Sequence, residues 1–435
     1  MNKLKTYKFS DSYEMSSGIS SKPEQAGHGS PFLSFSTVFN NEFVPEVLPD
    51  LMSTSEKEKE TYSIKEGDIF LTRTSETLDE LGMSCVAVKD YPKASYSGFL
   101  KRLRPTQKDI TYPKFMAFYL RSYLFRKTMN NNAIMTLRAS LNEQIFSYLD
   151  LILPSYEEQV KVGDLFYRIS EKIEVNNKIN QELEAMAKTL YDYWFVQFDF
   201  PDVHGKPYKS SGGNMVFNEE LKREIPEGWR ANIFDDVLYT VNDSMDSNDY
   251  PNLNYLPIDK LPSNQLYYQD YSERKNAKSS LIRFKEDDIL LGAMRVYFHR
   301  VCNAIEDGIS RSTIMVLRPH EAIFKNFCLF TLNRKEAIEF ANINSTGSSI
   351  PYAKWDKGLS RYKISTPNNL KILENFNKVT DPILENFKKL SKQNQKLSEV
   401  RDWLLPMLMN GQVTVGEVES ELGMVGEEGK TYNTK

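Results

Sequence analysis

Two long stretches of the sequence space their hydrophobic residues by alternating steps of four and three, which is the pattern of a coiled-coil seam. The first covers residues 169–194 and the second covers residues 383–404. An asparagine interrupts each seam at the same point, Asn180 in the first and Asn394 in the second. Because a seam asparagine fixes helix register, we predict two helices, each of roughly 40 residues and about 60 Å, that pack antiparallel. The alternative is that each helix packs only on its own globular domain.

Shorter apolar runs ahead of the two helices repeat in the same order. The segment "IKEGDIFLTR" at 64–73 recurs as "FKEDDILLGA" at 284–293, where a charged turn leads into a short apolar strand. The tripeptide "LRP" at 103–105 recurs at 317–319. A repeat this long is no solenoid and indicates a duplicated domain. We therefore predict an α+β protein with two similar α/β domains, two long antiparallel helices and a pseudo-twofold internal repeat.

The composition bounds the class of protein. A chain of 435 residues is long enough for two to four domains, and no apolar run approaches the roughly 18 residues of a membrane span. The chain start lacks the apolar stretch of a signal peptide, and the three cysteines are scattered, so we expect a cytoplasmic protein without disulfides. None of the four histidines has metal-ligand spacing, so we expect no metal site.

Several segments resemble the specificity subunit of type I restriction-modification systems. They are "LPSYEEQ" at 153–159, "AKTLYDYWFVQFDFP" at 187–201, "IPEGW" at 225–229 and "LLPMLMNGQV" at 404–413. The resemblance implies two target-recognition domains that each read one half of a bipartite DNA site. It also implies helices that act as a spacer and dock two modification subunits, and a complex that includes restriction subunits.

The resemblance and the composition together give expected boundaries. The stretch 201–229 is rich in glycine, proline, serine and charge, as linkers are, and the acidic end is expected to fray. The expected parts are recognition domain 1 (1–153), a central spacer helix (154–200), a linker (201–225), recognition domain 2 (226–366), a distal spacer helix (367–411) and a flexible acidic tail (412–435).

The net charge of −4 means that DNA binding must come from local sites, because nonspecific affinity comes from cations that neutralise phosphates. Base readout favours arginine, asparagine and glutamine side chains on loops, with serine, threonine and lysine on phosphates. In the first half the candidates are Arg73, Thr74, Ser75, Arg102, Thr136, Arg138, Ser140 and Asn142. In the second half they are Arg295, Tyr297, Arg300, Arg311, Ser345, Thr346, Gly347, Ser348, Ser349, Tyr352 and Lys354.

The loop "NSTGSSIPYAK" at 344–354 has a second interpretation. Its glycine, serine and threonine residues suit a phosphate contact at the start of a helix. The same residue types also cap helices without any DNA.

The aromatic residues near position 195 exceed what one seam can bury. We expect Trp194 to belong to the seam, and the surplus rings to point elsewhere and dock another subunit. The expected partner-binding residues are Tyr191, Tyr193, Phe195, Phe198 and Trp403. The alternative is that these rings pack under their own recognition domain.

No complete active site is evident in the sequence. Motifs for adenine methylation, S-adenosylmethionine binding and ATP binding are missing, so the chemistry is expected to belong to partner subunits that use S-adenosylmethionine, ATP and Mg²⁺. One alternative is a Mg²⁺-dependent nuclease that uses Asp202, Glu220 and Lys222. The other is a coiled-coil scaffold without a DNA role.

Overall fold

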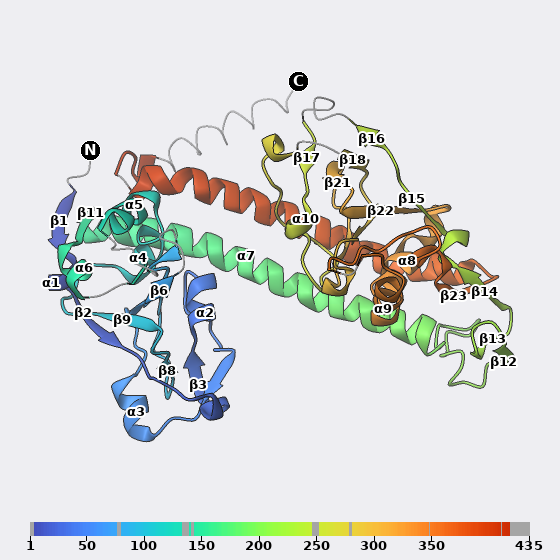
Figure 1. Ribbon diagram of the computed structural model, residues 1–435, viewed down its shortest axis with the longest axis horizontal. Helices are drawn as coiled ribbons and strands as arrows, with labels where there is room; N and C mark the ends of the chain where they lie inside the picture. The colour runs from blue at the N-terminus through green and yellow to red at the C-terminus, as the bar shows by residue number, and fades with distance from the viewer. Residues whose placement is uncertain are drawn as a thin grey trace. The chain divides into compact units, whose positions relative to one another are not determined.

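The computed structural model describes residues 4–75, 80–132, 139–140, 143–245, 252–277, 281–347, 349–409 and 411–417 (Figure 1). The chain forms two compact units, Met1–Glu171 with Ser398–Lys435, and Lys172–Leu397. Two long helices, α7 (Tyr156–Tyr191) and α10 (Lys371–Met409), contribute residues to both units. No helix within the described ranges is long and apolar enough to cross a membrane.

The first unit contains four small sheets among its described residues, and short helices packed on the start of α7. Its strands are β1 (Lys5–Lys8), β2 (Tyr13–Ser17), β3 (Ala26–Leu33), β4 (Asp50–Met52), β5 (Ile69–Thr72), β6 (Thr74–Ser75), β7 (Ser84–Val86), β8 (Ser95–Tyr96), β9 (Leu100–Pro105), β10 (Ala139–Ser140) and β11 (Asp150–Leu153). Its shorter helices are α1 (Phe9–Ser12), α2 (Phe35–Asn40), α3 (Glu56–Thr61), α4 (Pro113–Tyr119), α5 (Tyr123–Asn132) and α6 (Glu143–Tyr148). The central sheet has the antiparallel order β2-β9-β5-β7.

The second unit repeats this plan. Its strands are β12 (Met215–Asn218), β13 (Arg223–Pro226), β14 (Trp229–Ile233), β15 (Leu238–Thr240), β16 (Ser244–Met245), β17 (Asn254–Tyr255), β18 (Leu281–Phe284), β19 (Ile289–Gly292), β20 (Val301–Asn303), β21 (Gly308–Arg311), β22 (Ile314–Pro319) and β23 (Lys363–Pro367). Its shorter helices are α8 (Lys325–Leu332) and α9 (Lys335–Ile343). The central sheet has the order β15-β22-β19-β20, the counterpart of the sheet in the first unit.

The central strand of each sheet is buried on both faces, which explains its unbroken apolar sequence. Successive side chains of a strand point to opposite faces. In β5, Ile69 and Leu71 belong to the core beside α4 and α7, whereas Phe70 belongs to a second core beside α2. In β19, Ile289 and Leu291 face one core and Leu290 faces another. The run "IFL" at 69–71 therefore has no solvent-facing polar position.

The repeated "LRP" and charged turns also have one structural reason. Arg104 forms two hydrogen bonds with the buried Asp68 carboxylate, at 2.7 and 2.6 Å. Arg318 does the same with Asp288, at 2.6 and 2.7 Å. The aspartates are 0% and 2% exposed, so each carboxylate depends on its arginine for neutralisation. The pair joins the turn before the central strand to the neighbouring strand in both units.

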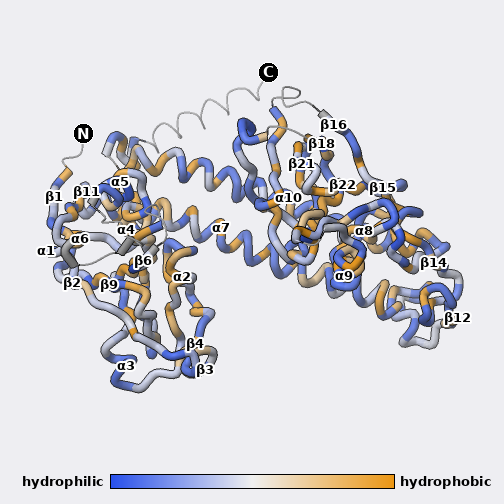
Figure 2. Tube along the Cα trace, in the orientation of Figure 1, coloured by the Kyte–Doolittle hydropathy of each residue, from blue (hydrophilic) through white to orange (hydrophobic). Residues whose placement is uncertain are grey.

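The long helices pack antiparallel within the second unit. The Asn176 side chain donates to the Asn394 side-chain oxygen at 2.7 Å. Just beyond the end of α7, 18 residues after Asn176, the Trp194 ring lies 5.6 Å from that of Phe376, which is 18 residues before Asn394 in α10. Figure 2 shows hydrophobic and polar positions alternating along both helices. The prediction of a mixed helix-sheet protein with two domains and two long antiparallel helices is confirmed.

The asparagine pairing differs from the expected match by one helical turn. Asn394 bonds with Asn176 and, at 2.8 Å, with Asn177, rather than with Asn180. In an antiparallel pair, equivalent residues face each other only near the local symmetry axis, so matched asparagines need not meet. Asn180 is fully buried, and among the described residues its side-chain amide has no hydrogen-bond partner.

The stretch expected as a linker contains ordered structure. Residues 201–225 include a turn at 202–206 and most of the hairpin formed by β12 and β13. Glycine and proline residues there serve tight turns rather than a loose spacer.

Candidate nucleic-acid interface

In the first unit the structure brings together two of the segments that the sequence indicated for DNA contact. Arg73 follows β5, and its backbone N–H donates to the Phe99 carbonyl at 2.9 Å. The next two residues form β6, which pairs antiparallel with β10, so that Thr74 lies opposite Ser140. The loop after the central strand is therefore held at one edge by the loop before β9 and at the other by β10.

The second unit builds the same arrangement. Ala293 follows β19, and its N–H donates to the Thr313 carbonyl at 2.9 Å. Met294 then lies opposite Tyr352 in an antiparallel bridge, and the Arg295 N–H donates to the Pro351 carbonyl at 2.7 Å. Three predicted segments, 293–300, 309–313 and 344–354, thus meet at one edge of the sheet.

Several predicted side chains at these edges are free to reach a ligand. Those exposed to solvent are Arg73, Arg295, Tyr297, Arg311, Thr346, Gly347, Ser349 and Lys354. Gly347 has a φ of 97°, and a Cβ there would lie 2.7 Å from the Ile350 carbonyl oxygen, so the tight turn requires glycine. Thr74 is half-buried.

Three of the predicted DNA contacts are structural instead. Arg102 is only 9% exposed and donates to the Ser63 carbonyl at 2.9 Å, so its guanidinium ties β9 to a neighbouring loop. Arg300 is half-buried and donates to the Ile258 carbonyl at 2.8 Å. The Tyr352 hydroxyl donates to the Ser312 carbonyl. Their hydrogen-bonding groups hold the interface together.

The loop at 344–354 does not begin a helix. It follows the end of α9, and the Ser345 hydroxyl donates to the Ala341 carbonyl at 2.8 Å within that helix. The expected phosphate site at a helix start is therefore wrong, and so is the N-capping alternative. Exposed Thr346 and Ser349 still offer hydroxyl groups beside the interface.

Four predicted residues lie outside the described part of the chain: Thr136, Arg138, Asn142 and Ser348. Ser75 and Ser140 are described only through their backbone, in β6 and β10.

Most of the aromatic surplus is core. Tyr191, Phe195 and Phe198 are 4%, 2% and 2% exposed, so they offer no docking surface. The Phe195 ring packs 5.0 Å from Phe327 and 4.9 Å from Phe376, because α8, β14 and α10 surround the end of α7 on several sides. These three rings therefore pack inside the second unit, against α8, β14 and α10. Tyr193 and Trp403 are 38% and 66% exposed and remain candidates for partner contact.

Local backbone geometry separates these rings. Residues Asp192–Val196 form a π-helical turn, which inserts extra chain into the helix. Trp194 and Phe195 face the core within this turn, whereas Tyr193 faces solvent. The regular period of an α-helix does not predict which of these neighbouring rings face the core and which faces solvent.

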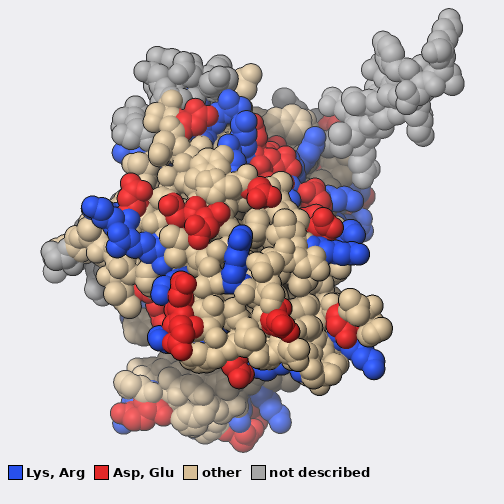
Figure 3. Space-filling model, turned by 90° about the vertical axis from the view of Figure 1, so that its right-hand side faces the viewer, with Lys and Arg blue, Asp and Glu red and all other residues tan. Residues whose placement is uncertain are grey.

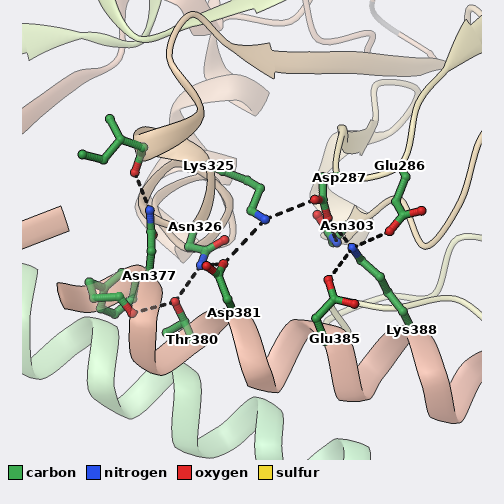
Figure 4. Close-up of polar contacts among 12 residues, drawn as sticks. Glu286, Asp287, Asn303, Lys325, Asn326, Asn377, Thr380, Asp381, Glu385 and Lys388 are labelled. Atoms are coloured by element: carbon green, nitrogen blue, oxygen red, sulfur yellow. Dashed lines mark hydrogen bonds and ion pairs between the residues drawn. The ribbon is translucent and has the colours of Figure 1, made fainter. Parts of the chain in front are cut away.

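A polar cluster fastens α10 to the second domain (Figure 4). The Lys388 amine lies 2.8 Å from Glu286, 2.7 Å from Asp287 and 2.8 Å from Glu385. Burial alone would lower the pKa of Lys388, but the hydrogen bonds that its amine donates to Asp287, Glu286 and Glu385 outweigh burial and raise that pKa. The three carboxylates are close enough to hold a metal ion, yet the lysine amine already supplies the cation at their centre.

The nuclease alternative finds no support in the geometry. The Asp202 carboxylate accepts the backbone N–H groups of His204 and Lys206, both at 2.8 Å, which closes a turn. Glu220 and Lys222 lie exposed in the turn between β12 and β13. Within the described ranges, Glu286, Asp287 and Glu385 are the only group of three acidic, histidine or cysteine residues with metal-binding proximity.

The charge distribution agrees with local rather than global attraction to DNA. On the face shown in Figure 3, acidic and basic side chains are interspersed over a largely uncharged surface.

The cysteines are free and buried, and burial raises the pKa of Cys85 to about 12.

Known proteins with similar sequences now become informative. The sequence model of the type I restriction modification DNA specificity domain matches residues 10–185. The MjaIX specificity subunit of a type I restriction enzyme from Methanocaldococcus jannaschii is 24% identical over 351 residues, covering 77% of this chain and 76% of that protein. Residues 10–185 thus match a type I DNA specificity domain, and most of the chain is similar to a type I specificity subunit.

Further similarities fit this assignment. The HindI specificity subunit from Haemophilus influenzae is 22% identical over 323 residues, covering 61% of this chain and 70% of that protein. The crystal structure of a type I restriction-modification S subunit from M. genitalium has a TM-score of 0.57 at 11% identity, and 94% of this chain and 96% of that chain are covered. Both curated relatives are named specificity subunits, and these similarities do not support the nuclease and scaffold alternatives.

Proposed function

We propose that this specificity subunit reads a bipartite DNA target, with one half-site at each of the two candidate interfaces. The observation that carries the proposal is their duplication. Both place the loop after the central strand between two hydrogen-bonded neighbours, with Arg73 at the first interface and Arg295 at the second. Arginine beside a base edge favours guanine, and exposed hydroxyl groups suit phosphates.

The proposed division of labour follows the domain boundaries given above. Residues 1–153 and 226–366 would recognise DNA, and the helical regions 154–200 and 367–411 would set the distance between half-sites. Exposed Tyr193 and Trp403 would contact two modification subunits, because large exposed rings are typical of interfaces. The expected complex also contains restriction subunits, works in the cytoplasm and takes S-adenosylmethionine, ATP and Mg²⁺ on its partners.

The direct test is long-read mapping of N6-methyladenine across the source genome, with and without this chain. The expected result is that deletion removes one motif made of two short half-sites and a fixed gap. Re-expression of the intact chain should restore the same motif. An unchanged pattern in a strain that expresses the modification subunits would refute the proposal.

A further inference from the structure

A short turn at the second interface displays two aromatic rings to solvent. Tyr297 and Phe298 are 49% and 41% exposed, and their ring centroids lie 4.9 Å apart. They belong to the single 3-10 turn Val296–Phe298, directly after Arg295. Exposed paired rings on a recognition loop do not contribute to the core, so their position needs another reason.

The turn is held in a conformation that costs free energy. Arg295 and His299, which flank it, have φ values of 52° and 53°, the left-handed region that non-glycine residues avoid. Hydrogen bonds on both sides maintain it: Arg295 N–H to the Pro351 carbonyl at 2.7 Å, and Asn264 N–H to the His299 carbonyl at 2.8 Å. Buried Val296 anchors its base. The rings are therefore preorganised outside the core.

Two arginines flank the turn along the chain. The Arg300 guanidinium lies 5.3 Å from the centre of the Phe298 ring, and Arg295 is exposed at the start of the turn. Apolar rings next to an exposed arginine match a nucleic acid, whose bases stack on aromatic side chains while its phosphates attract the cation. A purely apolar protein partner would leave Arg295 without a counter-charge.

We propose that Tyr297 and Phe298 form an aromatic wedge that stacks against, and partly separates, one base step in the half-site read by the second domain. The inference rests on the proposed DNA-reading function and adds how part of the sequence is read. A wedge selects base steps that unstack at low cost, so it contributes specificity without hydrogen bonds to base edges.

The test uses the full chain assembled with its modification subunits. The probe is a duplex carrying the methylation motif of this chain, with 2-aminopurine placed at successive positions of each half-site. Methyltransferases flip their target base out of the duplex, so the adenines that become methylated are left out of the comparison. At the remaining positions, the wild-type complex should increase fluorescence at one step of one half-site only. Tyr297→Ala/Phe298→Ala should abolish that increase and weaken binding about 10- to 100-fold, and Phe298→Trp should retain the increase.

The matched control is Phe217→Ala, which removes a ring that is 59% exposed on β12. This variant should keep both the affinity and the fluorescence change. If the wild-type complex binds its motif without any fluorescence increase, or the double variant binds within twofold of wild type, the wedge is refuted while DNA recognition stands. If the wild-type complex binds no motif, the proposed function itself fails. The wild-type fluorescence result decides the matter even if the double variant does not fold.

Discussion

The two units contain equivalent central sheets, but each unit is attached to its long helix by different side-chain contacts. In the first unit the Lys114 amine lies 4.1 Å from the Tyr167 ring centre and 3.0 Å from Asp164, and the Phe43 ring packs 5.0 Å from Tyr167. The second unit instead uses the polar cluster around Lys388 (Figure 4). The features that both units contain, the central sheet and its arginine–aspartate pair, are therefore those that position the loops proposed to read DNA.

That cluster belongs to a longer polar stripe on α10. Asn377 donates to the Ile323 carbonyl at 2.8 Å, and Asn326 donates to Thr380 at 2.7 Å and Asp381 at 2.8 Å. Since these positions recur about once per helical turn, one face of α10 carries the contacts. Many combinations of complementary residues can attach a domain to a helix. Each loop proposed to read DNA, in contrast, needs the same backbone support in both domains.

Breaking the arginine–aspartate ion pair that each unit contains should reduce the free energy of unfolding most. Arg104→Ala and Arg318→Ala each leave a buried aspartate unpaired, and each should destabilise its own unit by about 3 kcal/mol. Urea denaturation followed by site-specific fluorophores in each unit measures this. Lys335→Ala, which alters a side chain 83% exposed, is the control and should change little. A loss below about 1 kcal/mol would contradict the structural role of the pair.

Breaking the polar joint should have an intermediate effect confined to the second unit. Lys388→Met leaves three carboxylates around an apolar side chain and should cost about 2 kcal/mol at pH 7, since solvent partly screens the acids. Lys392→Met is the control because that amine is 46% exposed and lies 3.6 Å from a single carboxylate. Equal losses of unfolding free energy for the two variants would contradict a special role for Lys388.

The pH dependence sharpens this prediction. Burial opposes ionisation of Asp287, but Lys388 and Lys325 lower its pKa, so its contribution is present above the unfolded pKa of about 3.9 and is lost as pH falls through the folded value. The raised pKa of Lys388 keeps its contribution intact at neutral pH. The difference between wild type and Lys388→Met should therefore narrow below about pH 4. Urea titrations at pH 7 and at about pH 3 measure it, and a wider difference in acid would contradict this assignment.

The smallest effect is expected within the helix pair. Asn180→Leu removes a buried amide that lacks a partner within the described residues and should stabilise the second unit by about 1 kcal/mol. Asn176→Leu removes the bonds to Gln393 and Asn394 and should destabilise it. Thermal unfolding of both variants compares them, and destabilisation by Asn180→Leu would show that its amide is satisfied, for instance by water.

The sequence was sufficient to predict those parts of the fold that hydrophobic periodicity or internal repetition indicates. Hydrophobic spacing revealed both long helices and their antiparallel pairing, and the matched segments indicated two similar domains. The loops chosen for readout meet at one edge in the second unit, although they are separated along the chain. Repetition helped because both copies must build the same backbone support.

Local sequence did not distinguish structural residues from functional ones of the same type. Arg102 and Arg73 are both basic candidates of the first unit, yet Arg102 is bound to a loop carbonyl whereas Arg73 is exposed. Phe195 looks surplus to the seam until α8 and β14 cover it. The elements that cover Phe195 are distant from it in sequence. Hydrophobic periodicity within one helix does not predict such long-range contacts.

The most direct test of two separate reading edges is genome-wide methylation mapping for Arg73→Ala and Arg295→Ala/Arg311→Ala. Wild type should give one bipartite motif, and each variant should relax or abolish recognition of a different half while the other half and the gap persist. If both variants altered both halves together with intact assembly, the two domains would not read DNA independently, and the account would be contradicted.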